Sequence, residues 1–95
     1  MGKGQKLLDR WADNLPREAR RQEVITFLDT YFPHMWTQNK SSHIVVRCDA
    51  LKGFPGYQPY GEISVPIKGG QKVKGFYVKR LIKAVALLLE LGEES

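Results

Sequence analysis

The chain has 95 residues, of which 42% are hydrophobic, and a formal net charge of +5; these values predict one globular domain with a modest core rather than a disordered chain. No apolar run reaches the roughly 20 residues that a membrane span needs, and no apolar region follows the first residues as in a secretory signal. The single cysteine, Cys48, excludes an internal disulfide and a cysteine-only zinc site. We therefore expect a cytoplasmic protein without a metal or other cofactor.

Two helices are predicted in the first third of the chain. Apolar residues recur at helical spacing over residues 5–14, and Pro16 interrupts that pattern. A second helix is predicted from Arg17 to Tyr31, where the same spacing returns. Met35–Asn39 is predicted as a short strand, and the polar residues 40–42 as a tight turn.

The clearest strand is predicted over residues 43–49, a β-branched run in which side chains alternate between two faces. Ile44, Val46 and Cys48 are expected to face the core. His43 and Arg47 then share the opposite face, where an imidazole and a guanidinium project together.

The second half of the domain is predicted as a loop, a strand and a helix. Residues 50–61 are rich in glycine, proline and aromatic side chains and indicate an irregular loop. Residues 62–68 alternate again as a strand. A glycine-punctuated basic loop leads to a helix that begins near Gly75 and carries an apolar stripe. The predicted class is α+β: two helices, a small antiparallel meander and a closing helix on one face of it.

Positive charge is concentrated in one part of the chain. Residues 1–39 carry six bases against five acids, whereas residues 40–83 carry nine bases against Asp49 and Glu62 alone. Clustered lysine and arginine attract polyanions and release their counterions. A solubilising surface is the ordinary alternative, but an excess confined to half a domain favours a nucleic acid partner.

His43 is the strongest candidate for chemistry. Cleavage of RNA needs a base that takes the proton of a 2′-hydroxyl and an acid that protonates the leaving oxygen, and histidine titrates near the pH at which either role works. A histidine at the start of a strand is more often a plain surface residue. His34 is expected to cap or pack at a turn, and together with His43 and Cys48 it matches no zinc-ligand spacing.

Two other segments admit both a functional and a structural interpretation. Backbone N–H groups around Gly69 and Gly70, ahead of a helix, can bind a phosphate, or the segment is simply the turn between strand and helix. The aromatic residues Phe54, Tyr57 and Tyr60 can stack on bases, but they more often anchor a long loop to its domain.

These features, in this order, resemble the HicA toxin family, which are small mRNA interferases of type II toxin–antitoxin systems. The likeness covers roughly residues 20–88 of a single domain spanning 1–95, with residues 1–15 as an extra N-terminal helix. Lys40-Ser41-Ser42-His43 before a β-branched strand is similar to the family's Gly-Ser-His pattern. Val65-Pro66-Ile67-Lys68-Gly69-Gly70 is similar to its Pro-x-His-Gly-Gly segment, and Lys74-Gly75 opens a helix as its Gly-Thr-Leu segment does.

The resemblance implies a fold like the double-stranded-RNA-binding domain, α-β-β-β-α. This chain departs from the family in a long loop, residues 50–61, between the second and third strands. It also implies that His43 is the catalytic residue of a metal-independent endoribonuclease. The partners it implies are mRNA and a HicB-like antitoxin that covers the site, with oligomers formed through that antitoxin. The residues expected to bind RNA are Lys40, Ser41, Ser42, Arg47, Lys68, Gly69, Gly70, Lys72, Lys74, Lys79 and Arg80.

Two alternatives remain open on the same fold. One is a module that binds RNA without cleaving it, and the other is a protein-interaction domain whose contact is the aromatic loop over residues 54–60.

Overall fold

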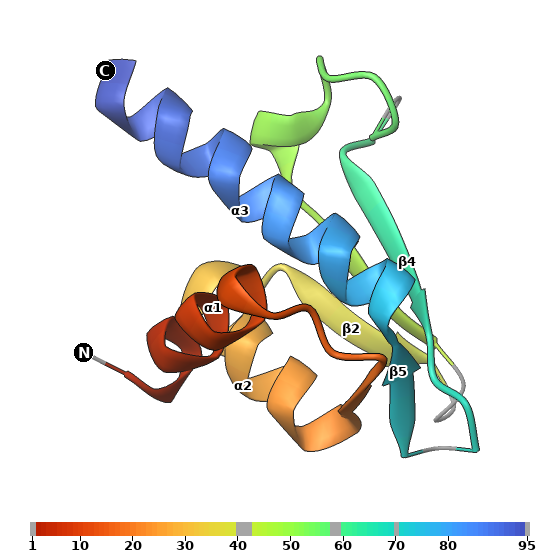
Figure 1. Ribbon diagram of the computed structural model, residues 1–95. Coiled ribbons are helices and arrows are strands. Elements are labelled where there is room, and N and C mark those ends of the chain that lie inside the picture. The colour runs from red at the N-terminus through yellow and green to blue at the C-terminus, as the bar shows by residue number, and fades with distance from the viewer. Residues whose placement is uncertain (1, 40–42, 58–59, 70, 95) are drawn as a thin grey trace.

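The computed structural model describes residues 2–39, 43–57, 60–69 and 71–94. Over these ranges the fold is α+β, as expected, with three α-helices and two small antiparallel sheets (Figure 1). No helix among these residues is long and apolar enough to cross a membrane. In chain order the elements are α1 (Lys3–Asp13), β1 (Glu18–Arg20), α2 (Arg21–Tyr31), β2 (Trp36–Asn39), β3 (His43–Arg47), the 3₁₀ turn η1 (Asp49–Leu51), β4 (Glu62–Pro66), β5 (Lys72–Lys74) and α3 (Gly75–Glu94).

The larger sheet is the predicted meander, with strand order β2-β3-β4. In its register His43 lies opposite Asn39 on one side and Pro66 on the other, and Arg47 lies opposite Glu62. The alternation predicted for β3 is confirmed: Ile44 and Val46 are buried, whereas His43 and Arg47 are exposed. Cys48 is buried as well.

The smaller sheet corrects two predictions. Residues 18–20 were expected to begin a helix, but they form β1, and β5 lies in the segment expected to be a loop. The two strands pair antiparallel, with Ala19 opposite Val73 and Arg20 opposite Lys72. Each strand has three residues, too few for an alternating pattern to stand out in the sequence. The pair is held in place because Ala19 and Val73 are both buried in the core.

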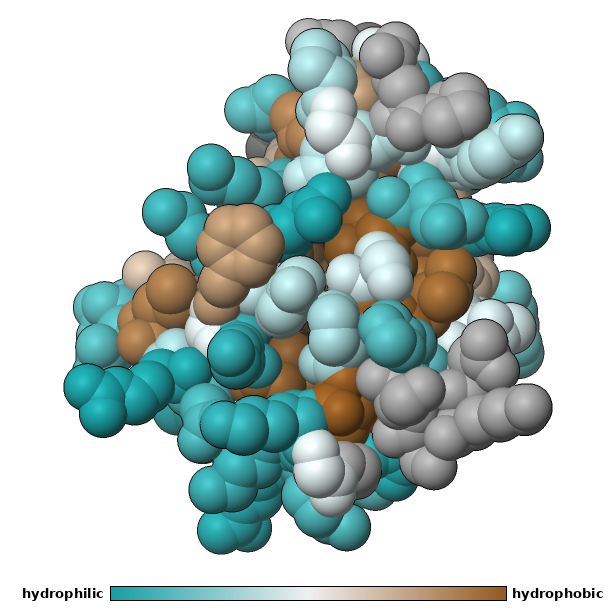
Figure 2. Space-filling model, turned by 90° about the vertical axis from the view of Figure 1, so that its right-hand side faces the viewer, coloured by the Kyte–Doolittle hydropathy of each residue, from teal (hydrophilic) through white to brown (hydrophobic). Residues whose placement is uncertain are grey.

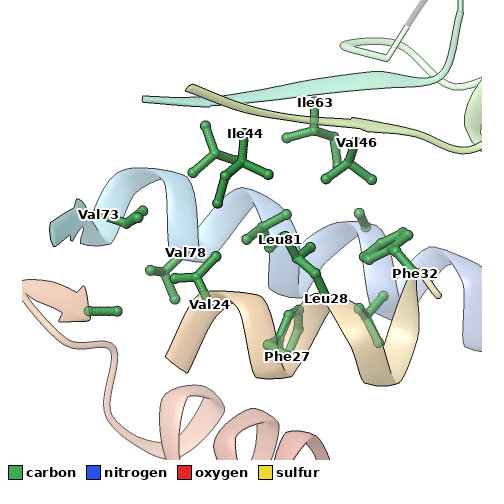
Figure 3. Packing of buried hydrophobic residues seen from close by; sticks show 14 of the residues in the cluster. Val24, Phe27, Leu28, Phe32, Ile44, Val46, Ile63, Val73, Val78 and Leu81 are labelled. Atoms are coloured by element: carbon green, nitrogen blue, oxygen red, sulfur yellow. The ribbon is translucent and has the colours of Figure 1, made fainter. Parts of the chain in front are cut away.

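The core lies between the meander and the helices. Figure 3 shows Ile44 and Val46 of β3 and Ile63 of β4 directed toward α3 and α2. On the helical side the contacts come from residues such as Leu28 and Leu81, which are fully buried. Burying one such side chain contributes roughly 1.5–3 kcal/mol. The helices therefore cover one face of the meander and leave its other face uncovered.

The N-terminal helix α1 is part of this core rather than an appendage. Trp11 is 2% exposed and its ring lies 5.3 Å from that of Phe27 in α2. The two helices approach so closely at Gly4 that a Cβ there would lie 2.0 Å from the Thr30 hydroxyl oxygen. Only a residue without a side chain fits at this crossing.

The loop after β3 is anchored by apolar contacts. Leu51 and Tyr57 are buried and Phe54 is half-buried, whereas Tyr60 is exposed. The loop closes at Gly61, where φ is +67° and a Cβ would lie 2.0 Å from the Cys48 carbonyl oxygen. The anchoring role that the sequence favoured therefore holds for Tyr57.

We predict that Gly4→Ala destabilises the protein although alanine favours a helix. The gain in helix propensity is about 1 kcal/mol, but the added methyl group pushes α1 away from α2 and disturbs the Trp11 contact. We expect a net loss of about 1–2 kcal/mol in the free energy of unfolding, measured by denaturant titration. Gly53→Ala is the matched control, since nothing lies within 4 Å of a Cβ there. Equal stabilities of the two variants would contradict the close crossing.

A second prediction concerns Glu23 in the first turn of α2. Partial burial alone raises the pKa of its carboxyl, but hydrogen bonds from Arg10 (2.6 Å) and from the Arg20 amide (3.2 Å), with the charges of both arginines, hold that pKa below 4.5. A pKa depressed by folding stabilises the protein above the unfolded-state pKa and loses this effect as the pH falls through the folded-state pKa.

Glu23→Gln should therefore lower the free energy of unfolding at neutral pH by about 0.5 kcal/mol, a small value because the pair is partly exposed to solvent. The difference from the parent protein should shrink as the pH falls below about 4.5. Urea titrations at neutral and acidic pH measure it, and a difference that does not change with pH rules out the ionised pair as its cause.

Candidate functional site

His43 begins β3 at one end of the uncovered face of the meander. Its side chain is exposed, and its neighbours in the register are Asn39 of β2 and Pro66 of β4. Val45 and Ser64 lie further along the same face, because side chains alternate along each strand. Histidine at this position is accessible to a bound molecule.

Three cations form a row beside this end of the meander, and we call Arg20, Lys68 and Lys72 the cation row. Lys72 lies opposite Arg20 in the β1–β5 pair, and Lys68 forms a further antiparallel bridge with Lys72. Residues directly opposite each other project to the same side of a sheet. Ile67 is buried, so the strand alternation directs Lys68 to the same side as Pro66, the residue opposite His43.

The cation row places like charges opposite one another. Like charges directly opposite one another destabilise a pair of strands. Two carboxylates lie near the row: that of Glu18 is 3.8 Å from the Lys72 ammonium, and that of Glu23 accepts a hydrogen bond from the Arg20 amide at 3.2 Å. Lys74 lies opposite Glu18 and adds a fourth cation to the exposed side of the ribbon. A phosphate would offset this repulsion.

The hairpin turn explains Gly69 without a ligand. Its φ is +61°, a conformation that glycine adopts at no steric cost. The Lys68 N–H donates to the Lys72 carbonyl at 2.7 Å, and the Lys68 carbonyl accepts from the Gln71 and Lys72 amides. At the start of α3, the Gly75 amide donates to the Arg17 carbonyl at 2.8 Å. The described residues of this segment therefore form a turn between two paired strands, and the second strand leads directly into a helix.

Arg47 and Arg80 lie away from His43 and contact the loop after β3. The Arg47 Nε donates to the Glu62 carboxylate at 2.9 Å, and its guanidinium carbon lies 6.0 Å from the centre of the Tyr60 ring. Arg47 lies four positions along β3 from His43, about 13 Å of strand. Arg80 donates to the Gly56 carbonyl at 3.2 Å.

The structure thus brings together part of the predicted set. The residues that share one end of the molecule are His43, Lys68 and Lys72. Arg47 and Arg80 do not adjoin them. Lys79 is exposed on α3. Lys40, Ser41, Ser42 and Gly70 lie outside the described residues.

Two arginines at this end were missed by sequence reasoning. Arg20 belongs to the cation row, and Arg21 begins α2 with its amide donating to the Gln71 carbonyl at 2.8 Å. The Arg21 guanidinium donates to the Gln38 side chain, while its Nε is buried and has no partner among the described residues. The Arg-Arg pair is visible in the sequence, but its position depends on the β1–β5 pairing.

The side of the molecule that holds β4 and β5 is shown in Figure 2. Hydrophilic residues surround smaller apolar areas on this side. Within the described ranges no group of three or more histidine, cysteine, aspartate or glutamate side chains is placed to hold a metal ion. The arrangement combines an exposed imidazole with fixed positive charge, which suits a polyanion as ligand.

Comparisons of the chain with models of protein families, with curated proteins and with solved structures found no match.

We predict that neutralising the cation row weakens polyanion binding. The double substitution Lys68→Gln/Lys72→Gln should lower the affinity for heparin about tenfold and reduce its dependence on salt, because two fixed charges no longer release counterions. Lys52→Gln/Lys83→Gln removes the same charge from two exposed lysines, one directly after η1 and one in α3, and is the matched control. Equal losses in both variants would mean that net charge alone governs binding.

Proposed function

We propose that this chain is an RNA-binding endoribonuclease of the HicA type, which cleaves mRNA without a metal ion and uses His43 as general acid or base. The observation that carries the proposal is the exposed side chain of His43 at the end of the uncovered meander, beside the cation row. An RNA strand whose phosphates lie along the row brings a ribose within reach of this end of β3.

The chemistry needs only groups of the RNA and the protein. The 2′-oxygen of a ribose attacks the adjacent phosphorus, its bond to phosphorus forms, and the bond to the 5′-oxygen breaks. One proton leaves the 2′-hydroxyl and another reaches the 5′-oxygen, and His43 serves one of these transfers. Lys68 and Lys72 neutralise the charge that grows on the phosphorane oxygens. The products end in a 2′,3′-cyclic phosphate and a 5′-hydroxyl.

The proposal includes a fold like the double-stranded-RNA-binding domain. What supports it is the order α2-β2-β3-β4-α3, in which helices cover one face of a three-stranded antiparallel meander. The helix α1 and the β1–β5 ribbon are then additions to that plan. The proposed partner is a HicB-like antitoxin. Its acidic surface binds the face of the meander that the helices leave exposed, and its charge complements that of the cation row.

We predict that His43→Asn abolishes RNA cleavage. Asparagine keeps a polar side chain of similar reach but has no group that titrates near neutral pH, so the rate should fall by about 10²–10⁴-fold. Purified protein is incubated with mRNA in the presence of a chelator, and the ends of the fragments are analysed for cyclic phosphate. His34→Asn is the matched control, because His34 is also exposed and its positive φ of 63° tolerates asparagine.

The two variants separate the possible functions. Cleavage that His43→Asn removes and His34→Asn retains supports the enzyme. Salt-sensitive RNA binding by all forms without cleavage would replace it with a non-catalytic RNA-binding module. Absence of RNA affinity at physiological salt would leave a protein-interaction domain.

A further inference from the structure

A groove lined by apolar residues lies beside the start of α3. Leu15, Pro16 and Phe76 line this groove of about 570 Å³, and Arg17 and Lys74 supply positive charge at it. Glu18 also lines it, with its carboxylate 3.8 Å from the Lys72 ammonium, so the cations exceed the acids. Leu15 is 43% exposed and Phe76 is 65% exposed, so the groove presents two large apolar side chains to solvent. We call it the Leu15–Phe76 groove. Apolar side chains gathered with cations suit a ligand that is both apolar and acidic.

The far end of the same helix has that chemistry. Residues 84–91 are all apolar apart from Glu90, and Glu93 and Glu94 follow. Leu87 and Leu88 are half-buried against the core, whereas Leu89 is 54% exposed on another side of the helix. In Figure 1 the end of α3 projects past the other helices. A helix that is apolar on nearly all sides is normally covered by protein.

The two surfaces cannot meet within one chain. Both belong to α3 or lie beside it, and its 20 residues form one continuous helix. At 1.5 Å per residue this helix holds its two ends about 30 Å apart. An acidic apolar helix end that fits a basic apolar groove must therefore find that groove on another molecule.

We propose that this protein associates with itself head to tail, with the end of α3 (residues 86–94) of one copy docked in the Leu15–Phe76 groove of the next. Leu89 packs against Phe76 and Leu15, and Glu90 lies near Arg17 and Lys74. Such a contact joins two different surfaces and is heterologous, so it produces a ring where the rotation closes and an open chain where it does not. The contact does not depend on His43 or on the proposed ribonuclease activity.

Two substitutions, one on each of the two surfaces, test the contact without weakening the fold. Phe76→Glu places an acid in the first turn of α3, where the helix dipole favours it, and opposes the docking of Glu90. Leu89→Gln removes the apolar contact and keeps a good helix former. Met35→Glu is the control, an exposed apolar residue (42%) outside both surfaces. Sedimentation velocity from micromolar to millimolar protein measures the association, and thermal melts verify the fold.

The parent protein and Met35→Glu should associate, and each of the other two variants should associate at least about tenfold more weakly. An equimolar mixture of Phe76→Glu and Leu89→Gln should form a heterodimer, because one molecule keeps its helix end and the other its groove. The double variant should remain monomeric. A parent protein that is monomeric throughout, or variants that fail to complement each other, would overturn the proposal.

Discussion

The alternation of side chains along β3 is the constraint on which the rest of the structure depends. Because Ile44 and Val46 are fully buried, the strand cannot shift by one residue without exposing both and burying His43 and Arg47. The same apolar contacts that hold the meander to the helices therefore fix the side on which the imidazole lies. Stability and the accessibility of His43 follow from one register.

The register of the smaller sheet determines on which side its positively charged side chains lie. Ala19 and Val73 are buried opposite each other, which sends Arg20 and Lys72 together to the outer side. Their repulsion is modest in water and is tolerated because the core holds the strands in place. Positive charge is thus concentrated by apolar packing rather than by contacts between the charged groups.

Much of the fold could be predicted, because long elements carry repeating patterns. The helices α1 and α3 and the strand β3 have enough residues for their periodicity to stand out, and their burial agrees with it. The three-residue strands β1 and β5 have no such pattern, and their pairing joins segments about fifty residues apart. The candidate site could be predicted only as far as His43, Lys68 and Lys72. The contribution of Arg20, and the contacts of Arg47 with Glu62 and Tyr60, depend on tertiary pairing.

The β1–β5 ribbon passes directly into two helices without intervening loops. Arg20 is followed at once by α2 and Lys74 by α3, so the pairing of β1 with β5 brings together the starts of the two helices that cover the meander. Two helices whose first residues are about fifty positions apart in the sequence therefore start from one pair of hydrogen-bonded strands.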